Sequence, residues 1–183
     1  MILTTIPQVQ KLLLTNVIAP HGITDIIHAY HYKSFHHLAY CYGTNIAITT
    51  VLGHYKYNTI IYALLCIGSF FHFRHDFRFP IASISICLPL TNICTFGTLC
   101  SIIRDPDPMF YIYMCLLHVP HHFEMASSYI HPYKWWTIGL LCMVSACTQC
   151  IWKTKQPQKW FPLGVGIILG HIWYGEKYIL KSL

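Results

Sequence analysis

Long apolar stretches recur along the whole chain, separated by proline, glycine or charged residues. Each stretch is close to the roughly 20 apolar residues that a helix needs to cross a bilayer. The pattern therefore predicts an all-α, polytopic transmembrane helical bundle of about seven spans, with about six to eight also compatible. The predicted spans are 9–31, 36–53, 57–76, 79–103, 108–131, 133–152 and 160–181.

The composition agrees with a membrane fold. Hydrophobic residues make up 55% of the 183 residues, and the mean hydropathy is +0.45. Charged residues make up only 10%, against about 25% in soluble domains, which is too few to cover a water-exposed surface. Because the spans would use about 140 residues, they leave no room for a separate soluble domain. We therefore expect residues 1–183 to form a single, multi-pass integral membrane domain.

The net charge of +6 comes from 12 basic and 6 acidic side chains, which lie singly near the ends of the predicted spans. This scatter is typical of membrane flanks, and without a basic stripe it does not indicate a nucleic-acid partner. The basic residues divide evenly between the two sides of the predicted bundle, so orientation, host membrane and protein partners are not predicted. The N-terminus lacks a basic segment ahead of its apolar stretch, so we expect no cleaved signal peptide.

Histidine is unusually frequent, with 13 in the chain. Three motifs place a histidine four residues before an aspartate or a second histidine, and such residues share one face of a helix. These pairs are His21 and Asp25, His72 and Asp76, and His118 and His122. They lie toward the C-terminal ends of the first, third and fifth spans, which run in the same direction in an up-and-down bundle. We therefore expect them at a similar depth, where the seventh span adds His171.

Imidazoles that converge in a dry bundle need a common partner, because a neutral imidazole keeps one lone pair that apolar neighbours cannot satisfy. A divalent transition metal supplies this partner, and imidazole suits zinc, copper, iron and nickel. Asp25 and Asp76 suit the role of acceptors for the N–H groups of the metal ligands, and we place His171 beside them as a further polar partner. The other histidines are expected to hydrogen-bond between helices or to lie at the membrane interface: His28, His31, His36, His37, His54, His75, His121 and His131.

The chain carries three motifs in order, Pro-His-Gly-x-x-Asp at 20–25, Phe-His-Phe-x-x-Asp-Phe at 71–77 and His-x-x-x-His-Phe at 118–123. In type and order these motifs resemble the Brp/Blh membrane family of β-carotene 15,15′-dioxygenases. The resemblance covers about residues 20–125, with a weaker echo at Gly170-His171. The chain is shorter than typical members, and Arg74 stands where the family pattern has glycine.

This resemblance implies an all-α membrane oxidoreductase that holds a non-haem iron(II) ion, Fe(2+), through four histidines. With O₂, such an enzyme cleaves the central double bond of β-carotene to give two retinals. By motif position, the catalytic residues, which would act by binding the iron, would be His21, His72, His118 and His122. Asp25 and Asp76 would be polar partners of the site. The expected partners are therefore an apolar polyene, O₂ and the lipid bilayer, with a shorter or oxygenated polyene and another apocarotenal product left open.

Two other functional classes fit parts of the sequence. The segment His118-Val119-Pro120-His121-His122 matches the His-x-x-His-His box of di-iron membrane desaturases and hydroxylases. However, two irons need about eight histidines in three boxes, and the remaining histidine pairs do not reproduce the other two boxes. A non-enzymatic transporter that moves metal ions or protons along its histidines is the second alternative. Metal stoichiometry separates these classes: one tightly held iron, two irons, or a weakly bound, exchangeable ion.

Overall fold

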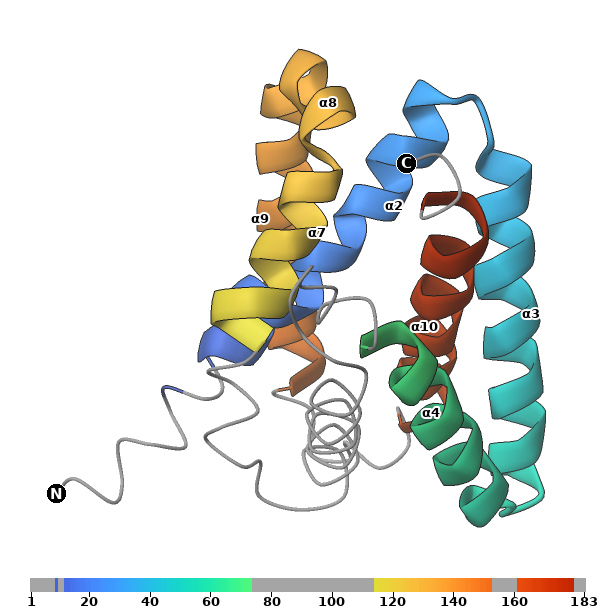
Figure 1. The fold of residues 1–183 in the computed structure, drawn as a ribbon. Helices are drawn as coiled ribbons and strands as arrows, with labels where there is room; N and C mark the ends of the chain where they lie inside the picture. Colours follow the sequence, from blue (N-terminus) through green and yellow to red (C-terminus); the bar gives the residue numbers. More distant parts are fainter. Residues whose placement is uncertain (1–8, 10–11, 74–113, 153–160, 180–183) are drawn as a thin grey trace, which may run out of the picture.

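The computed structural model describes residues 9, 12–73, 114–152 and 161–179 (Figure 1). Within these ranges every regular element is a helix and none is a strand, so the all-α prediction is confirmed for this part of the chain. The predicted span at 79–103 lies outside the described residues.

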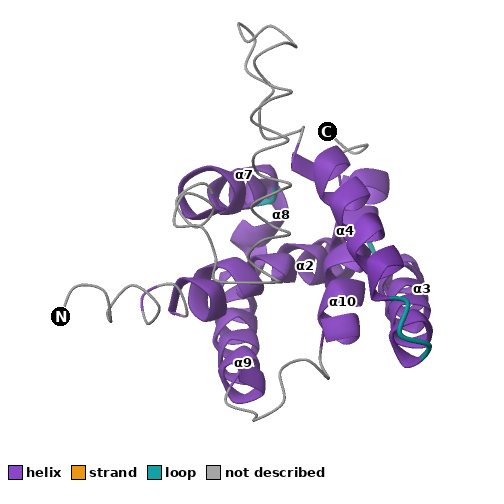
Figure 2. Cartoon of the chain, turned by 90° about the horizontal axis from the view of Figure 1, so that it is seen from below, coloured by secondary structure: helices purple, strands orange, loops and turns teal. Residues whose placement is uncertain are grey.

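The long α-helices follow the predicted spans closely. They are α3 (Phe35–His54), α4 (Asn58–Phe73), α9 (Lys134–Trp152) and α10 (Phe161–Tyr174), and the π-helical segment Gly175–Ile179 continues α10. The shorter helices are α2 (Ile23–His31), α7 (Val119–Met125) and α8 (Ser127–Ile130). Seen from below, α2 lies between α10 on one side and α7 to α9 on the other (Figure 2).

Proline subdivides the two predicted spans that carry most of the candidate ligands. Pro20 lies in a 3-10 turn, Ala19–Gly22, that joins a π-helical segment to α2, and Pro120 lies in the first turn of α7, directly after another π-helical segment. These π-helical segments are Leu14–Ile18 and Met114–His118. Proline lacks a backbone N–H and its ring clashes with the carbonyl four residues earlier, so a regular α-helix cannot run through it unchanged. In the described parts of the spans expected at 9–31 and 108–131, the single helix is therefore replaced by a series of shorter helical segments.

Helix α10 packs closely against α3 because two glycines, four residues apart, lie on its contact face. A Cβ atom on Gly170 would lie 2.8 Å from the Cα of Tyr42, and one on Gly166 would lie 2.7 Å from the Cα of Ile46. On another face of α10, Leu169 packs with the buried core residues Ile61 and Leu65 of α4. Helix α10 is thereby fixed between α3 and α4 (Figure 1).

Gly166→Ala is expected to destabilise the fold by about 1–3 kcal/mol, the usual cost of adding a group to a packed core. The added methyl would meet the Oγ1 atom of Thr49 at 2.5 Å, and the backbone of α3 cannot move away easily. Thermal unfolding of the purified variants measures the effect. Gly164→Ala is the matched control, because a Cβ there meets nothing within 4 Å, and alanine favours a helix over glycine. Equal unfolding midpoints for the two variants would contradict the close packing of α10.

The outer surfaces of the long helices are apolar. Helices α3, α4 and α10 contain no Asp, Glu, Lys or Arg. Trp135 and Trp136 at the start of α9 are each 75% exposed. Among the described residues, none of the helices combines the length and the mean hydropathy expected of a membrane span.

Candidate metal centre

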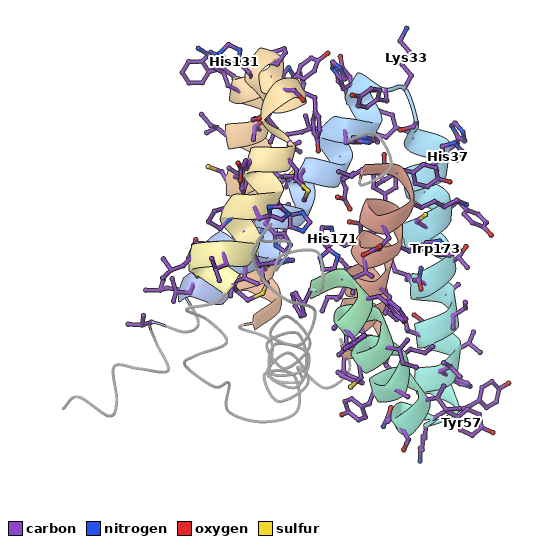
Figure 3. All side chains as sticks on the ribbon, viewed as in Figure 1. Lys33, His37, Tyr57, His131, His171 and Trp173 are labelled. Carbon is purple, nitrogen blue, oxygen red and sulfur yellow. The ribbon has the colours of Figure 1, made fainter. Side chains whose placement is uncertain are left out.

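Five buried histidine rings meet near the middle of the described helices. They are His21, His72, His118, His122 and His171. Figure 3 shows His171 on α10 midway between Lys33 and Tyr57, which lie at opposite ends of the molecule. The rings come from elements far apart in the sequence, so the fold, rather than a local motif, brings them together.

Four of these histidines are close enough to share one ion. Potential ligand atoms of His21, His118, His122 and His171 all lie within 4.8 Å of one another, and we call this set the four-histidine group. The ring centroids of His118 and His122 are 4.6 Å apart, and those of His21 and His171 are 4.8 Å apart. The ring of His122 lies 5.0 Å from that of His171.

Local sequence explains how these rings are presented. His118 ends its π-helical segment and His122 lies in α7, and their four-residue spacing turns both rings to one side. His21 follows Pro20 in the 3-10 turn before α2. His171 directly follows Gly170, one of the two glycines at which α10 lies close to α3.

Two members of the four-histidine group are held in a defined tautomer. His21 donates its Nδ1–H to the carbonyl oxygen of Ile18, and His171 donates its Nδ1–H to Oδ2 of Asp25 over 2.9 Å. In a neutral imidazole the second nitrogen then carries the lone pair. The Nε2 atoms of both rings are buried and have no hydrogen-bond partner among the described residues. Unsatisfied buried lone pairs are costly, and a shared cation satisfies both.

Asp25 is fully buried, and its Oδ2 accepts two hydrogen bonds. One comes from His171 and the other from the hydroxyl of Tyr42 over 2.7 Å. Asp25 therefore contacts a histidine of the group. Tyr42 was missed by the sequence analysis, because no motif marks it, and a search for donors to a buried carboxylate is the signal that could have found it.

The predicted ligand set and the four-histidine group differ by one residue. His21, His118 and His122 belong to both, whereas the group contains His171 in place of His72. The ring of His72 adjoins the group, 4.9 Å from that of His118 and 5.2 Å from those of His122 and His171. The predicted partner Asp76 and the neighbouring Arg74 lie outside the described residues.

The described histidines that were expected to bond between helices or to lie at the membrane interface are not members of the four-histidine group, and His75 lies outside the described residues. His28 is bonded through Nδ1 to the hydroxyl of Tyr174 over 2.9 Å. The rings of His36 and His37 contact each other, with centroids 3.9 Å apart, and His54 and His131 lie at helix ends. Within the described part of the chain, no second group of histidine, cysteine or acidic residues is close enough to hold another ion.

The donor set fits a transition metal. Four imidazoles offer neutral nitrogen ligands, which suit iron, zinc, copper and nickel, and Asp25 supplies negative charge through His171. The buried four-histidine group could therefore hold a metal ion. Comparison of the chain with protein-family models, with curated proteins and with solved structures found no match. The function is therefore inferred from the residues and their geometry.

Proposed function

We propose that the chain is a non-haem iron(II) dioxygenase that cleaves a double bond of a carotenoid-like polyene with O₂, giving retinal or a related apocarotenal. The observation that carries this proposal is the buried four-histidine group. Three of its residues, His21, His118 and His122, stand in the motifs that resemble the Brp/Blh family. Structural zinc sites usually contain cysteine. Four imidazoles on an ion that takes five or six ligands, such as iron(II), would leave one or two positions for O₂.

Each residue contributes to such a reaction through position and burial. Ile18 and Asp25 fix the rings of His21 and His171 through Nδ1, so the Nε2 lone pairs of both rings remain available to the metal. The exclusion of water around His118 and His122, which are 1% and 4% exposed, keeps the site dry for an apolar substrate. A bound iron supplies the binding and activation of O₂ beside the double bond. No protein nucleophile is needed.

The proposal predicts loss of orange pigment when the chain is expressed in cells that accumulate β-carotene. We expect an O₂-dependent C20 aldehyde, because symmetric cleavage of a C40 polyene gives two C20 products. His118→Ala should abolish the product, and His54→Ala, at an exposed helix end, should retain it. Mass spectrometry of extracted aldehydes is the measurement. Unequal aldehydes would keep the oxygenase and reject retinal formation, whereas iron-loaded protein without any aldehyde would contradict carotenoid cleavage.

The single four-histidine group favours this proposal over a di-iron desaturase. A second iron would need about four more ligands, and the described residues offer no second group. A transporter would bind its ion weakly and exchange it with solvent, whereas the four histidines of this group are no more than 8% exposed.

We also propose that a lipid bilayer covers the apolar outer faces, as expected for an integral membrane protein. Helix α3 has 20 residues, a length of about 30 Å, which is close to the thickness of a bilayer core. Lys33 and Lys56 lie in the turns at its two ends, next to the exposed tyrosines Tyr32, Tyr55 and Tyr57. Tyrosine and lysine are common at membrane interfaces. Between these ends, large apolar side chains such as Val51 face outward.

Membrane integration predicts that the chain stays in the membrane pellet after extraction at alkaline pH and is released only by detergent. The reason is that burial of apolar surface in lipid does not depend on charge, whereas peripheral attachment does. Centrifugation followed by quantification of the chain in pellet and supernatant measures this. Release into the alkaline supernatant would contradict integration.

A further inference from the structure

Asp25 joins three helices at a single carboxylate oxygen. The aspartate lies on α2, Tyr42 on α3 and His171 on α10, and the hydroxyl and the imidazole N–H both donate to Oδ2. Oδ1 is buried and has no hydrogen-bond partner among the described residues. A buried carboxylate is costly unless its charge is compensated, so both donors to Oδ2 matter for the stability of the charge.

The packing around Gly170 and Gly22 brings these residues together. Gly170 lets α10 approach α3 at Tyr42, because a Cβ atom there would lie 2.8 Å from the Cα of the tyrosine. A Cβ atom on Gly22 would lie 3.9 Å from both the hydroxyl of Tyr42 and Nδ1 of His171. The 3-10 turn before α2 therefore lies in ordinary van der Waals contact with both donors. The hydrogen-bonded chain from Tyr42 through Asp25 to His171 follows from this packing.

The chain of hydrogen bonds ends at the four-histidine group. His171 donates Nδ1–H to Asp25, so the lone pair of Nε2 is left for the ion. A carboxylate that accepts the N–H of a metal ligand fixes the ring and makes the ligand more basic. Within the described residues, Asp25 is the carboxylate bonded to a ring of this group, so its charge acts on the ion through His171.

We propose that Tyr42 is a positioning residue of the metal centre: by donating to Asp25, it sets how much negative charge the carboxylate passes to His171, and so tunes the affinity and the reduction potential of the bound metal. This inference rests on metal binding by the four-histidine group, and it is independent of the identity of the substrate. Donation by the hydroxyl withdraws charge from Oδ2, so loss of the hydroxyl leaves more charge on Oδ2, whereas loss of the carboxylate charge leaves less.

Two substitutions should therefore move the reduction potential of bound iron in opposite directions. Asp25→Asn removes the charge that favours the oxidised ion, so it raises the potential and weakens iron(II) binding by about 10- to 100-fold. Tyr42→Phe keeps the ring and the carboxylate but removes the donor, so Oδ2 gives more charge to His171. The potential then falls, and the affinity changes by less than about 10-fold.

The experiment is a redox titration of iron-loaded protein, together with cobalt(II) binding to the metal-free full chain followed by its visible spectrum. Tyr40→Phe is the matched control, because Tyr40 lies on the same helix and is 56% exposed. Opposite shifts for Asp25→Asn and Tyr42→Phe, with no shift for Tyr40→Phe, support the inference. A Tyr42→Phe potential equal to that of the wild type, or shifted in the same direction as that of Asp25→Asn, overturns it.

Cobalt binding separates this inference from the proposed function. If cobalt(II) binds and Tyr42→Phe changes its spectrum while no polyene is cleaved, the role of Tyr42 stands and the dioxygenase is rejected. If aldehyde forms but Tyr42→Phe changes neither the cobalt(II) spectrum nor the reduction potential of bound iron, the dioxygenase stands and the role of Tyr42 is rejected. Should Asp25→Asn fail to fold, the sign of the Tyr42→Phe shift decides alone, because phenylalanine preserves the packing against Gly170.

Discussion

His118→Ala and His122→Ala are each expected to weaken metal binding by more than the roughly 100-fold that loss of a ligand's hydrogen-bond partner costs. Both rings are buried and belong to the four-histidine group, so each substitution removes a direct ligand. The affinity of the metal-free chain for iron(II) or cobalt(II) is the measurement. His54→Ala and His131→Ala are the controls, because both positions are exposed and lie outside the group.

Equal metal content in all four variants would contradict the site. Far-ultraviolet circular dichroism of each variant shows whether its helices are intact.

Metal binding can also be followed through the stability of the protein, with and without a chelator. At a free metal concentration of 1,000 times Kd, the ion should stabilise the native state by about 4 kcal/mol, and this gain should vanish in His118→Ala.

His171→Ala is expected to lose more metal affinity than His72→Ala. A ligand atom of His171 lies within 4.8 Å of those of the other three members of the group, whereas His72 only adjoins them. His171 is also anchored by Asp25, so its loss removes both a ligand and the route by which negative charge reaches the ion. The measurement is again the affinity of each variant for cobalt(II) or iron(II).

The opposite order would favour the ligand set that the family resemblance implies. If His72→Ala lost the metal and His171→Ala kept it, then His21, His72, His118 and His122 would be the ligands. Equal large losses would indicate that all five rings contribute. The variant that loses more metal affinity identifies the ligand. This pair of variants therefore decides between the four-histidine group of the structure and the ligand set that the family resemblance implies.

Much of the candidate site could be predicted from helix periodicity. The four-residue spacing of His118 and His122 placed both on one face, and the recurrence of such pairs on alternate helices predicted that they would meet. The spacing also placed Asp25 on the same face as His21, whereas the histidine that Asp25 contacts is His171. These features depend on local geometry, which the sequence carries directly.

The sequence could not predict that His171, and not His72, belongs to the four-histidine group. This choice depends on how closely two helices approach each other. Gly170 and Gly166 let α10 lie against α3, and this sets His171 beside Asp25. Tyr42 becomes a partner of the site only through the same packing. A single sequence shows where a glycine stands, but it does not show which helix packs against that glycine.

The helix boundaries show the same division between local and tertiary information. The end of α3 at His54 was predicted within about one residue, because the polar turn after it is a local signal. The irregular segments around Pro20 and Pro120 were not predicted, although a regular α-helix cannot run unchanged through a proline. Neighbouring helices determine which partners the backbone N–H and C=O groups find where a proline interrupts the helix. The predicted span at 79–103 lies outside the described residues.

The most direct test of a mononuclear iron site is the ratio of metal to protein in the detergent-purified full chain after anaerobic loading with iron(II). The one four-histidine group among the described residues predicts one iron per chain, retained through gel filtration and absent from a His118→Ala, His122→Ala double variant. Two irons per chain, or no iron retained in the wild type, would contradict the account.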